Sequence, residues 1–197
     1  GGLAPVRYRD PTNGEWREEV PTFGHLGSLL RFYAYRPESA SMLPLILHDA
    51  AQGRYESLLS QSRALSGDIG DSMALGMHLS VSCTEDPEIA IRPEDDATIM
   101  GNDIVEFIQA QCAIWPKGKR DPHFRTPLRG DLPLLAISGE LDPVTPPRYG
   151  DEVVKTLPKA RHLVLPGQGH SVLTTGCMPK LFAQFVDAPI PDFPPEM

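Results

Sequence analysis

Apolar positions change their spacing along the chain, and each change predicts a different kind of element. Residues 6–20 alternate apolar and polar side chains around a turn-forming centre, which predicts a β-hairpin. Apolar side chains then recur every three or four positions over residues 22–36, which predicts a helix. A second helix is expected from Ser39, as its N-cap, to Ala51, and a third from about Tyr55.

The middle of the chain is less regular. Residues 78–83 alternate over a short run, which we interpret as a strand that stops at an acidic turn at residues 84–87. Residues 93–114 have helical spacing with a break near Gly101, and residues 117–131 form a charged linker that contains proline and glycine.

The last third of the chain predicts two parallel βα units. Residues 132–138 are almost all apolar, as in a strand that is buried on both faces, and residues 162–165 resemble them. Helices are expected at 147–157 and 178–186, so strand and helix alternate. A stable doubly wound sheet usually has about five strands or more, so we expect further strands to precede residue 1.

Composition excludes several classes of protein. A formal net charge of -8 without a basic run argues against a nucleic-acid partner, and no apolar stretch reaches the ~18–20 residues that cross a bilayer. The chain begins with glycine rather than methionine, so a missing leader says nothing about its compartment. Three cysteines fit no metal cluster, and spacing alone leaves both one bridge and three free thiols open.

Two polar loops follow the two apolar strands and contain the residues of chemical interest. The first loop contains Asp142, and the second, Gly167-Gln168-Gly169-His170, ends in a histidine. Because parallel strands place their carboxyl ends at one edge, an Asp and a His in this order match the acid and base of a Ser-Asp-His triad. Taken singly, the Asp-Pro dipeptide is more often a turn and a lone histidine more often structural.

Several motifs resemble the carboxy-terminal region of bacterial tripeptidyl aminopeptidase-like hydrolases, which are relatives of the prolyl aminopeptidases. The motifs are Leu134 to Pro147 with its Gly-Glu-Leu-Asp-Pro core, Gly167 to His170, Cys83-Thr84-Glu85-Asp86 and Cys112-Ala113-Ile114-Trp115-Pro116. The resemblance implies the C-terminal portion of an α/β-hydrolase fold, with parallel strands and a mainly helical lid. It also implies hydrolysis of amides or esters near a free amino terminus, through an acyl-serine and without metal or cofactor.

The resemblance also divides the chain and shows what it lacks. Residues 1–78 would form the lid and residues 79–197 the last part of the core, with 88–125 as lid or surface helices. The family's Gly-x-Ser-x-Gly nucleophile elbow does not occur in these 197 residues. Ser72 lacks the closing glycine and is expected to start a helix, and Ser171 follows the base in chain order. We therefore expect the nucleophilic serine in a missing N-terminal segment, and no activity from this chain alone.

Two further roles come from the resemblance. Glu85, at the end of the predicted strand, would bind the substrate's ammonium group; the alternative is that Glu85 or Asp86 caps the following turn. Cys83 and Cys112 would form a disulfide, with two buried thiols as the alternative. Related proteins are often exported, which favours a periplasmic or secreted protein.

The resulting prediction is a serine-type aminopeptidase that acts on a small peptide or an arylamide. The alternatives are an esterase or another small-molecule hydrolase, and a non-catalytic binding fragment.

Overall fold

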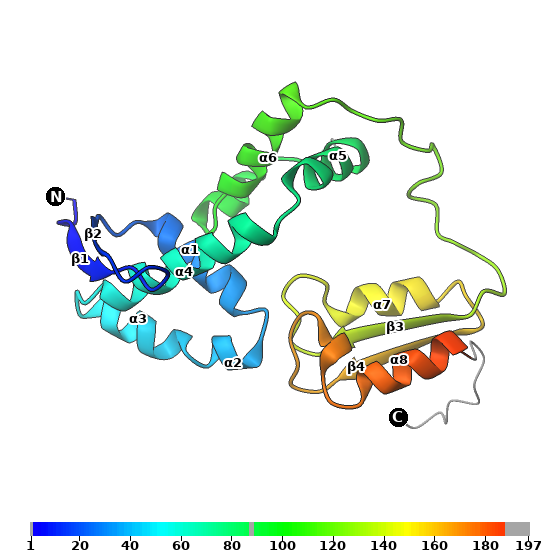
Figure 1. The fold of residues 1–197 in the computed structure, drawn as a ribbon. Helices are drawn as coiled ribbons and strands as arrows, with labels where there is room; N and C mark the ends of the chain where they lie inside the picture. Colours follow the sequence, from blue (N-terminus) through cyan, green and yellow to red (C-terminus); the bar gives the residue numbers. More distant parts are fainter. Residues whose placement is uncertain (1, 87–88, 188–197) are drawn as a thin grey trace. The chain divides into compact units, whose positions relative to one another are not determined.

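The computed structural model describes residues 2–86 and 89–187 and divides the chain into two compact units (Figure 1). The first unit combines Gly1–Phe32 with Pro44–Phe124, and the second combines Tyr33–Leu43 with Arg125–Met197. The first is mainly helical. In chain order its elements are β1 (Val6–Arg9), β2 (Trp16–Glu19), α1 (Phe23–Tyr33), α3 (Leu43–Ala51), α4 (Glu56–Ser72), α5 (Leu75–Glu85), the 3-10 helix η1 (Pro93–Ala97) and α6 (Asp103–Ile114).

The predicted hairpin is confirmed and is fixed to the first unit by one buried carboxylate. Strands β1 and β2 pair antiparallel, and Asp10 at their turn is fully buried. Its side chain accepts hydrogen bonds from Thr12, and from the guanidinium groups of Arg17 on β2 and Arg63 on α4. The bonds from Thr12, with those from the two arginines, hold the pKa of Asp10 well below its usual range.

The predicted helix at residues 22–36 is confirmed as α1. Thr22 precedes its first residue, and the Thr22 hydroxyl accepts a hydrogen bond from the His25 backbone N–H while the His25 ring accepts one from the Thr22 N–H. This reciprocal pair is a capping box in which a histidine replaces the usual glutamate.

The prediction of one helix from Ser39 to Ala51 is wrong. The structure has two helices here, α2 (Pro37–Ala40) and α3. Pro37 starts α2, since proline suits the first helical turn. The Ser39 hydroxyl donates to the carbonyls of Tyr33 and Arg36, so it closes the preceding turn instead of capping a helix.

The predicted strand at residues 78–83 is also wrong, because these residues belong to helix α5. Leu79 and Cys83 are four positions apart and both buried, whereas Val81 between them is 47% exposed. Burial therefore follows the helical period and not the alternation of a strand. The domain boundary predicted between residues 78 and 79 consequently falls inside α5.

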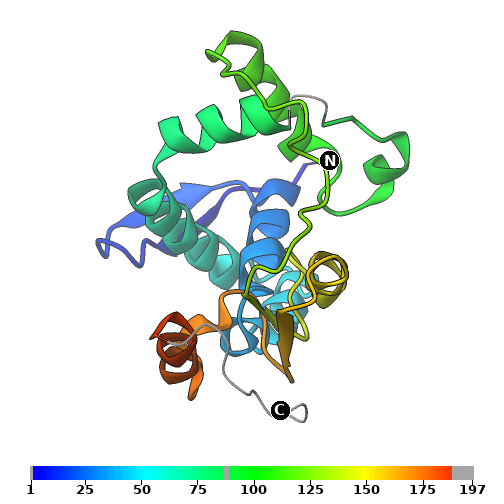
Figure 2. The ribbon, with the colours of Figure 1, turned by 90° about the vertical axis from the view of Figure 1, so that its right-hand side faces the viewer.

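The second unit contains a parallel strand pair with helices on both faces. β3 (Leu134–Gly139) pairs with β4 (Ala160–Leu165) in register, so that Gly139 lies opposite Leu165. Figures 1 and 2 show α7 (Pro147–Val154) and α8 (Met178–Asp187) on opposite faces of this pair. The predicted βα units are thus confirmed; the unit also contains α2 and the 3-10 helix η2 (Val172–Thr174).

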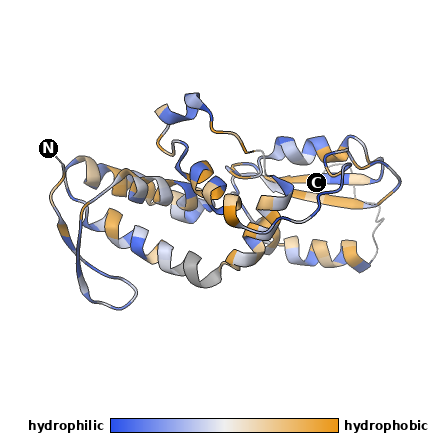
Figure 3. Ribbon diagram, turned by 90° about the horizontal axis from the view of Figure 1, so that it is seen from above, coloured by the Kyte–Doolittle hydropathy of each residue, from blue (hydrophilic) through white to orange (hydrophobic). Residues whose placement is uncertain are grey.

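The strands are less buried than the sequence predicts. Figure 3 shows them as predominantly hydrophobic, yet residues 134–138 of β3 are only half-buried. Within the described residues this sheet has two strands, so each strand keeps one unpaired edge. None of the helices in the described ranges is long and apolar enough to cross a membrane.

Candidate functional site: an Asp–His pair at the strand ends

The two candidate catalytic loops start at the same edge of the sheet. The last residues of β3 and β4, Gly139 and Leu165, are paired with each other, so the loops that follow them run side by side. Two backbone bonds join them: Glu140 N–H donates to the carbonyl of Leu165 (3.0 Å), and Leu141 N–H donates to the carbonyl of Gln168 (2.8 Å). The site is therefore built on paired backbone and not on two independent loops.

The structure brings Asp142 and His170 together. Nδ1 of His170 lies 2.9 Å from Oδ2 of Asp142. The His170 ring is about 29% exposed, whereas the Asp142 side chain is only 4% exposed. A buried carboxylate on Nδ1 fixes the ring and leaves Nε2 as the nitrogen that can accept a proton. Within the described residues, no side chain or backbone group bonds to Nε2.

Asp142 is held by its own loop as well as by the histidine. Its Oδ1 accepts the backbone N–H groups of Val144 (2.8 Å) and Thr145 (2.9 Å), and its Oδ2 accepts the Thr145 hydroxyl (2.8 Å). Burial acts to raise the pKa of Asp142, but these bonds and His170 outweigh burial and lower the pKa to about 2. The carboxylate is therefore ionised at neutral pH and can stabilise an imidazolium ion.

His170 is placed by backbone contacts with the segment before α2. Its N–H donates to the carbonyl of Tyr35 (2.6 Å), and the Tyr35 ring meets the imidazole edge-on, with centroids 5.1 Å apart. A Cβ on Gly169 would collide with the Tyr35 carbonyl, and one on Gly139 would collide with the Gly169 carbonyl. Both positions require glycine because three backbone segments meet there.

A cavity of about 270 Å³ opens beside the His170 ring. Arg36, Pro37 and Glu38 line one part of it, and the loop around Ser171 lines the other. Ser171 has a left-handed backbone (φ 65°), which is uncommon for a residue other than glycine.

The structure places Glu85 at the end of a helix and not at the end of a strand. It is the last residue of α5 and is half-buried. Its backbone carbonyl accepts a hydrogen bond from Arg120 (2.8 Å). In the described part of the chain, no hydrogen bond or ion pair involves its carboxylate. Sequence reasoning assigned the residue to the wrong kind of element, and its proposed role is untested.

A disulfide joins Cys83 on α5 to Cys112 on α6, with Cα atoms 5.2 Å apart. Leu79, Ile108 and Trp115 pack around it and form a small apolar core between the two helices. Cys177 is free and exposed.

Neither rejected serine gains support as a nucleophile. Ser72 was expected to start a helix, and this is wrong: it is the last residue of α4. Ser171 lies in the cavity beside His170. No hydrogen bond between its hydroxyl and the His170 ring is found among the described residues. No group of three or more potential metal ligands occurs in the part of the chain that the structure describes.

Sequence reasoning missed a second histidine that makes a polar network. His162 on β4 lies 2.9 Å from the Ser138 hydroxyl on β3 and 2.9 Å from the Asp151 carboxylate on α7. A Cβ on Gly150 would collide with this ring, so glycine permits the approach. The network joins both strands to α7. Thr145, the partner of Asp142, was also missed, although it lies in the motif that identified the acid.

Parallel βα units with an Asp–His pair beyond the strand ends are the arrangement found in α/β-hydrolases. Residues 97–192 match the family described as TAP-like protein. This carboxy-terminal part of the chain is therefore a TAP-like segment of the α/β-hydrolase fold, and its family is one of hydrolases. No curated protein and no solved structure matches the chain.

Proposed function

We propose that this chain supplies the acid and the base of a serine hydrolase. The observation that carries the proposal is the Asp142–His170 pair, which is hydrogen-bonded, holds an ionised carboxylate and leaves Nε2 without a partner in the described residues. The serine and the oxyanion hole would come from sequence upstream of residue 1, since these 197 residues contain no Gly-x-Ser-x-Gly. This chain alone would be inactive.

In the proposed reaction, each residue has a separate task. Nε2 of His170 takes the proton of the serine hydroxyl as the serine attacks the carbonyl carbon, and it later returns the proton to the leaving group. Asp142 holds the Nδ1–H tautomer and stabilises the imidazolium ion. Water then attacks the acyl-serine with the same histidine as base. The scheme requires no metal and no cofactor.

We propose further that the substrate carries a free amino terminus and that Glu85 binds its ammonium group. The support is chemical: Glu85 is half-buried, and its carboxylate makes no hydrogen bond or ion pair within the described residues, although Arg120 bonds to its backbone carbonyl. A carboxylate in a partly dry site binds an ammonium well and is left unpaired by a blocked substrate. The proposed activity is thus that of an aminopeptidase acting on short peptides or arylamides.

The test compares two substrates of the full-length protein: an arylamide with a free amino terminus and a simple ester. Glu85→Gln should lower kcat/KM for the arylamide by roughly thirty-fold or more, since a lost charge partner costs about 2–5 kcal/mol, and should spare the ester. His170→Ala should abolish both activities. Glu106→Gln, which removes an exposed charge from α6, is the matched control. Equal losses on both substrates after Glu85→Gln would remove the aminopeptidase assignment and leave the hydrolase.

An esterase is the second candidate, and a cavity in the first unit favours it. This cavity has a volume of about 440 Å³ and is lined mainly by apolar side chains, among them Leu26, Leu47 and Leu58. Its size is within the range of ligand pockets, and its lining suits an acyl chain. An activity that is unchanged by Glu85→Gln and rises with the length of the acyl chain would support this candidate.

We also propose that the protein is exported to the periplasm or secreted. The disulfide between Cys83 and Cys112 supports this, because such bonds persist in oxidising compartments. Fractionation of cells that express the full-length protein tests it, and recovery in the cytoplasm with both thiols reduced would contradict it.

A further inference from the structure

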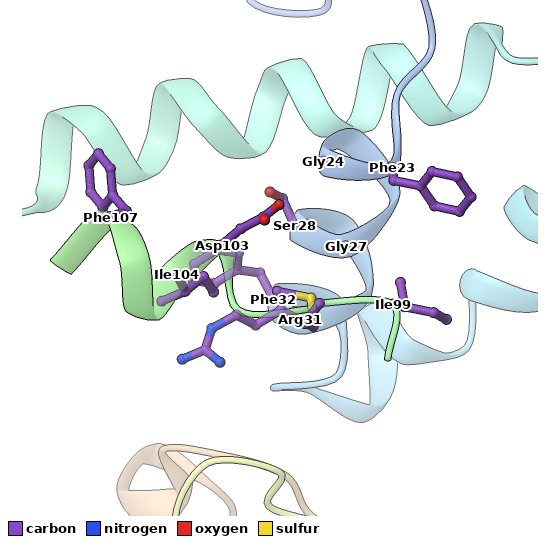
Figure 4. Close-up of a pocket in the computed structure, with 11 residues that line it drawn as sticks. Phe23, Gly24, Gly27, Ser28, Arg31, Phe32, Ile99, Asp103, Ile104 and Phe107 are labelled. Carbon is purple, nitrogen blue, oxygen red and sulfur yellow. The ribbon is translucent and has the colours of Figure 1, made fainter. Parts of the chain in front are cut away.

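A separate cavity lies within the first unit, between α1 and the first two turns of α6 (Figure 4). Its volume is about 290 Å³, which is at the lower end of the range for small-molecule sites. A molecule of the size of an amino acid or a dipeptide fits this volume, and a longer peptide does not.

The α1 surface that lines the cavity has two glycines and a serine at its centre, with larger side chains at its two ends. These small residues are Gly24, Gly27 and Ser28, whose i, i+3, i+4 spacing places them on one face of the helix. Gly27 is buried, and a Cβ there would lie 3.1 Å from the sulfur of Met100. A Cβ at Gly27 would therefore crowd Met100, whereas one at Gly24 would meet only the Thr22 hydroxyl within 4 Å.

Two opposite charges face the cavity without pairing with each other. Arg31 extends from the last turn of α1 and Asp103 from the first turn of α6. Figure 4 shows the Asp103 carboxylate directed toward Ser28 and the Arg31 guanidinium directed away from it. The described residues contain no hydrogen bond or ion pair of either side chain.

Aromatic surface completes the site. Phe107, one turn after Asp103 on α6, is 61% exposed, and Phe23 at the start of α1 is 79% exposed. Both line the cavity. Ligand pockets are lined mainly by apolar and aromatic side chains with a few polar or charged groups, and this cavity combines both kinds.

We infer that this cavity binds a small zwitterion, either a free amino acid or a dipeptide with a bulky apolar side chain. The ammonium group contacts Asp103 and the Ser28 hydroxyl, the carboxylate contacts Arg31, and the apolar side chain packs on Phe107. Arg31 lies at the C-terminal end of α1 and Asp103 at the N-terminal end of α6. Each helix end carries a partial charge of only about half an elementary charge. The full charges of the two side chains therefore outweigh the helix dipoles in attracting the ligand's charged groups. Binding here does not depend on the proposed hydrolysis.

The test is calorimetric titration of the 197-residue chain with leucyl-phenylalanine, N-acetyl-leucyl-phenylalanine and leucyl-phenylalanine amide. The free dipeptide should bind, and each blocked form should bind at least tenfold more weakly. Asp103→Asn should abolish the difference between the free and acetylated forms, and Arg31→Gln the difference between the free and amidated forms. Both residues are exposed, so these substitutions leave the core intact.

Two controls separate this site from the proposed active site. Glu106→Gln removes the same charge as Asp103→Asn from the same helix but does not line the cavity, and should bind like the wild type. His170→Ala should also bind like the wild type, so a failure of the hydrolase proposal leaves this result unchanged. Equal affinity for the three ligands, no binding of the free dipeptide at millimolar concentration, or uniform weakening in both variants would overturn the inference.

Discussion

At the scale of single residues, Asp142 explains why the site is ready for acid–base chemistry. Its two carboxylate oxygens accept two backbone N–H groups, a hydroxyl and the His170 ring. A carboxylate so fully bonded can stay buried and ionised, whereas an unpaired one would take up a proton. The charge of Asp142 beside His170 therefore does not change near neutral pH.

The lowered pKa of Asp142 predicts how stability depends on pH. The folded protein holds this carboxyl at a pKa of about 2, below its ordinary value of 3.8, so its contribution is complete above about pH 4 and is lost as the pH falls toward 2. Two pKa units correspond to about 2–3 kcal/mol. Urea unfolding at pH 5, 4, 3 and 2 should show a steeper loss of unfolding free energy for the wild type than for Asp142→Asn. Parallel curves for the two proteins would contradict the assignment.

The sequence predicts the catalytic residues of the site better than the groups that hold them in place. Asp142 and His170 stand directly after apolar runs, and this order is visible without a structure. The roles of Thr145 and Tyr35 are not visible, because one depends on a loop conformation and the other on a backbone carbonyl from a distant segment. Side-chain chemistry can be inferred from the sequence, but close approach of backbone cannot.

At the scale of elements, the hairpin, helix α1 and the βα units were predicted correctly, whereas the helix at 39–51 and the strand at 78–83 were not. Helix α1 and the βα units have enough residues to distinguish a period of 3.6 from a period of 2. Residues 78–83 are six in number, and both periods place Leu79 and Cys83 on one face. In the structure, residues 78–83 are helical and pack against α6 through Leu79 and the Cys83–Cys112 disulfide. Cys112 lies 29 residues from Cys83, so this contact is not visible in the local sequence.

The His162 network predicts which contact holds α7 on the strands. The His162 side chain is 6% exposed and that of Asp151 is 63% exposed, so the histidine lies in the interior and its carboxylate partner at the surface. His162→Ala removes two hydrogen bonds and the ring, and should lower the free energy of unfolding by roughly 2–4 kcal/mol. Asp151→Ala should lower the free energy of unfolding by about 1 kcal/mol or less. Denaturant unfolding of both variants checks this order, and equal costs would contradict it.

At the scale of the whole molecule, the chain divides into two units, each made of two segments that are separate in the sequence. Residues 33–43 belong to the second unit although the segments on both sides of them belong to the first. The bonds between Tyr35 and the His170 loop explain this assignment. The predicted division into a lid at residues 1–78 and a core at 79–197 assumed contiguous segments; which unit acts as a lid stays a prediction.

The disulfide should stabilise the first unit. Cys83 and Cys112 close a loop of about 29 residues, for which the entropy model gives roughly 3–4 kcal/mol. Replacing both cysteines with alanine, or adding a reductant, should lower the unfolding midpoint. Cys177→Ser should leave the midpoint unchanged, because that thiol is exposed and free. If reductant has no effect on the wild type, the two cysteines are not bridged in solution.

Covalent labelling with a serine-directed fluorophosphonate tests most directly whether Asp142 and His170 are the acid and base of a serine hydrolase. The full-length protein should be labelled at one serine outside these 197 residues. His170→Ala should slow labelling by roughly 10⁴-fold or more, and Asp142→Asn should cause a loss of similar order. The isolated chain should not be labelled. Labelling of the full-length protein at an undiminished rate after His170→Ala, or stoichiometric labelling of the isolated chain at Ser72 or Ser171, would contradict this account.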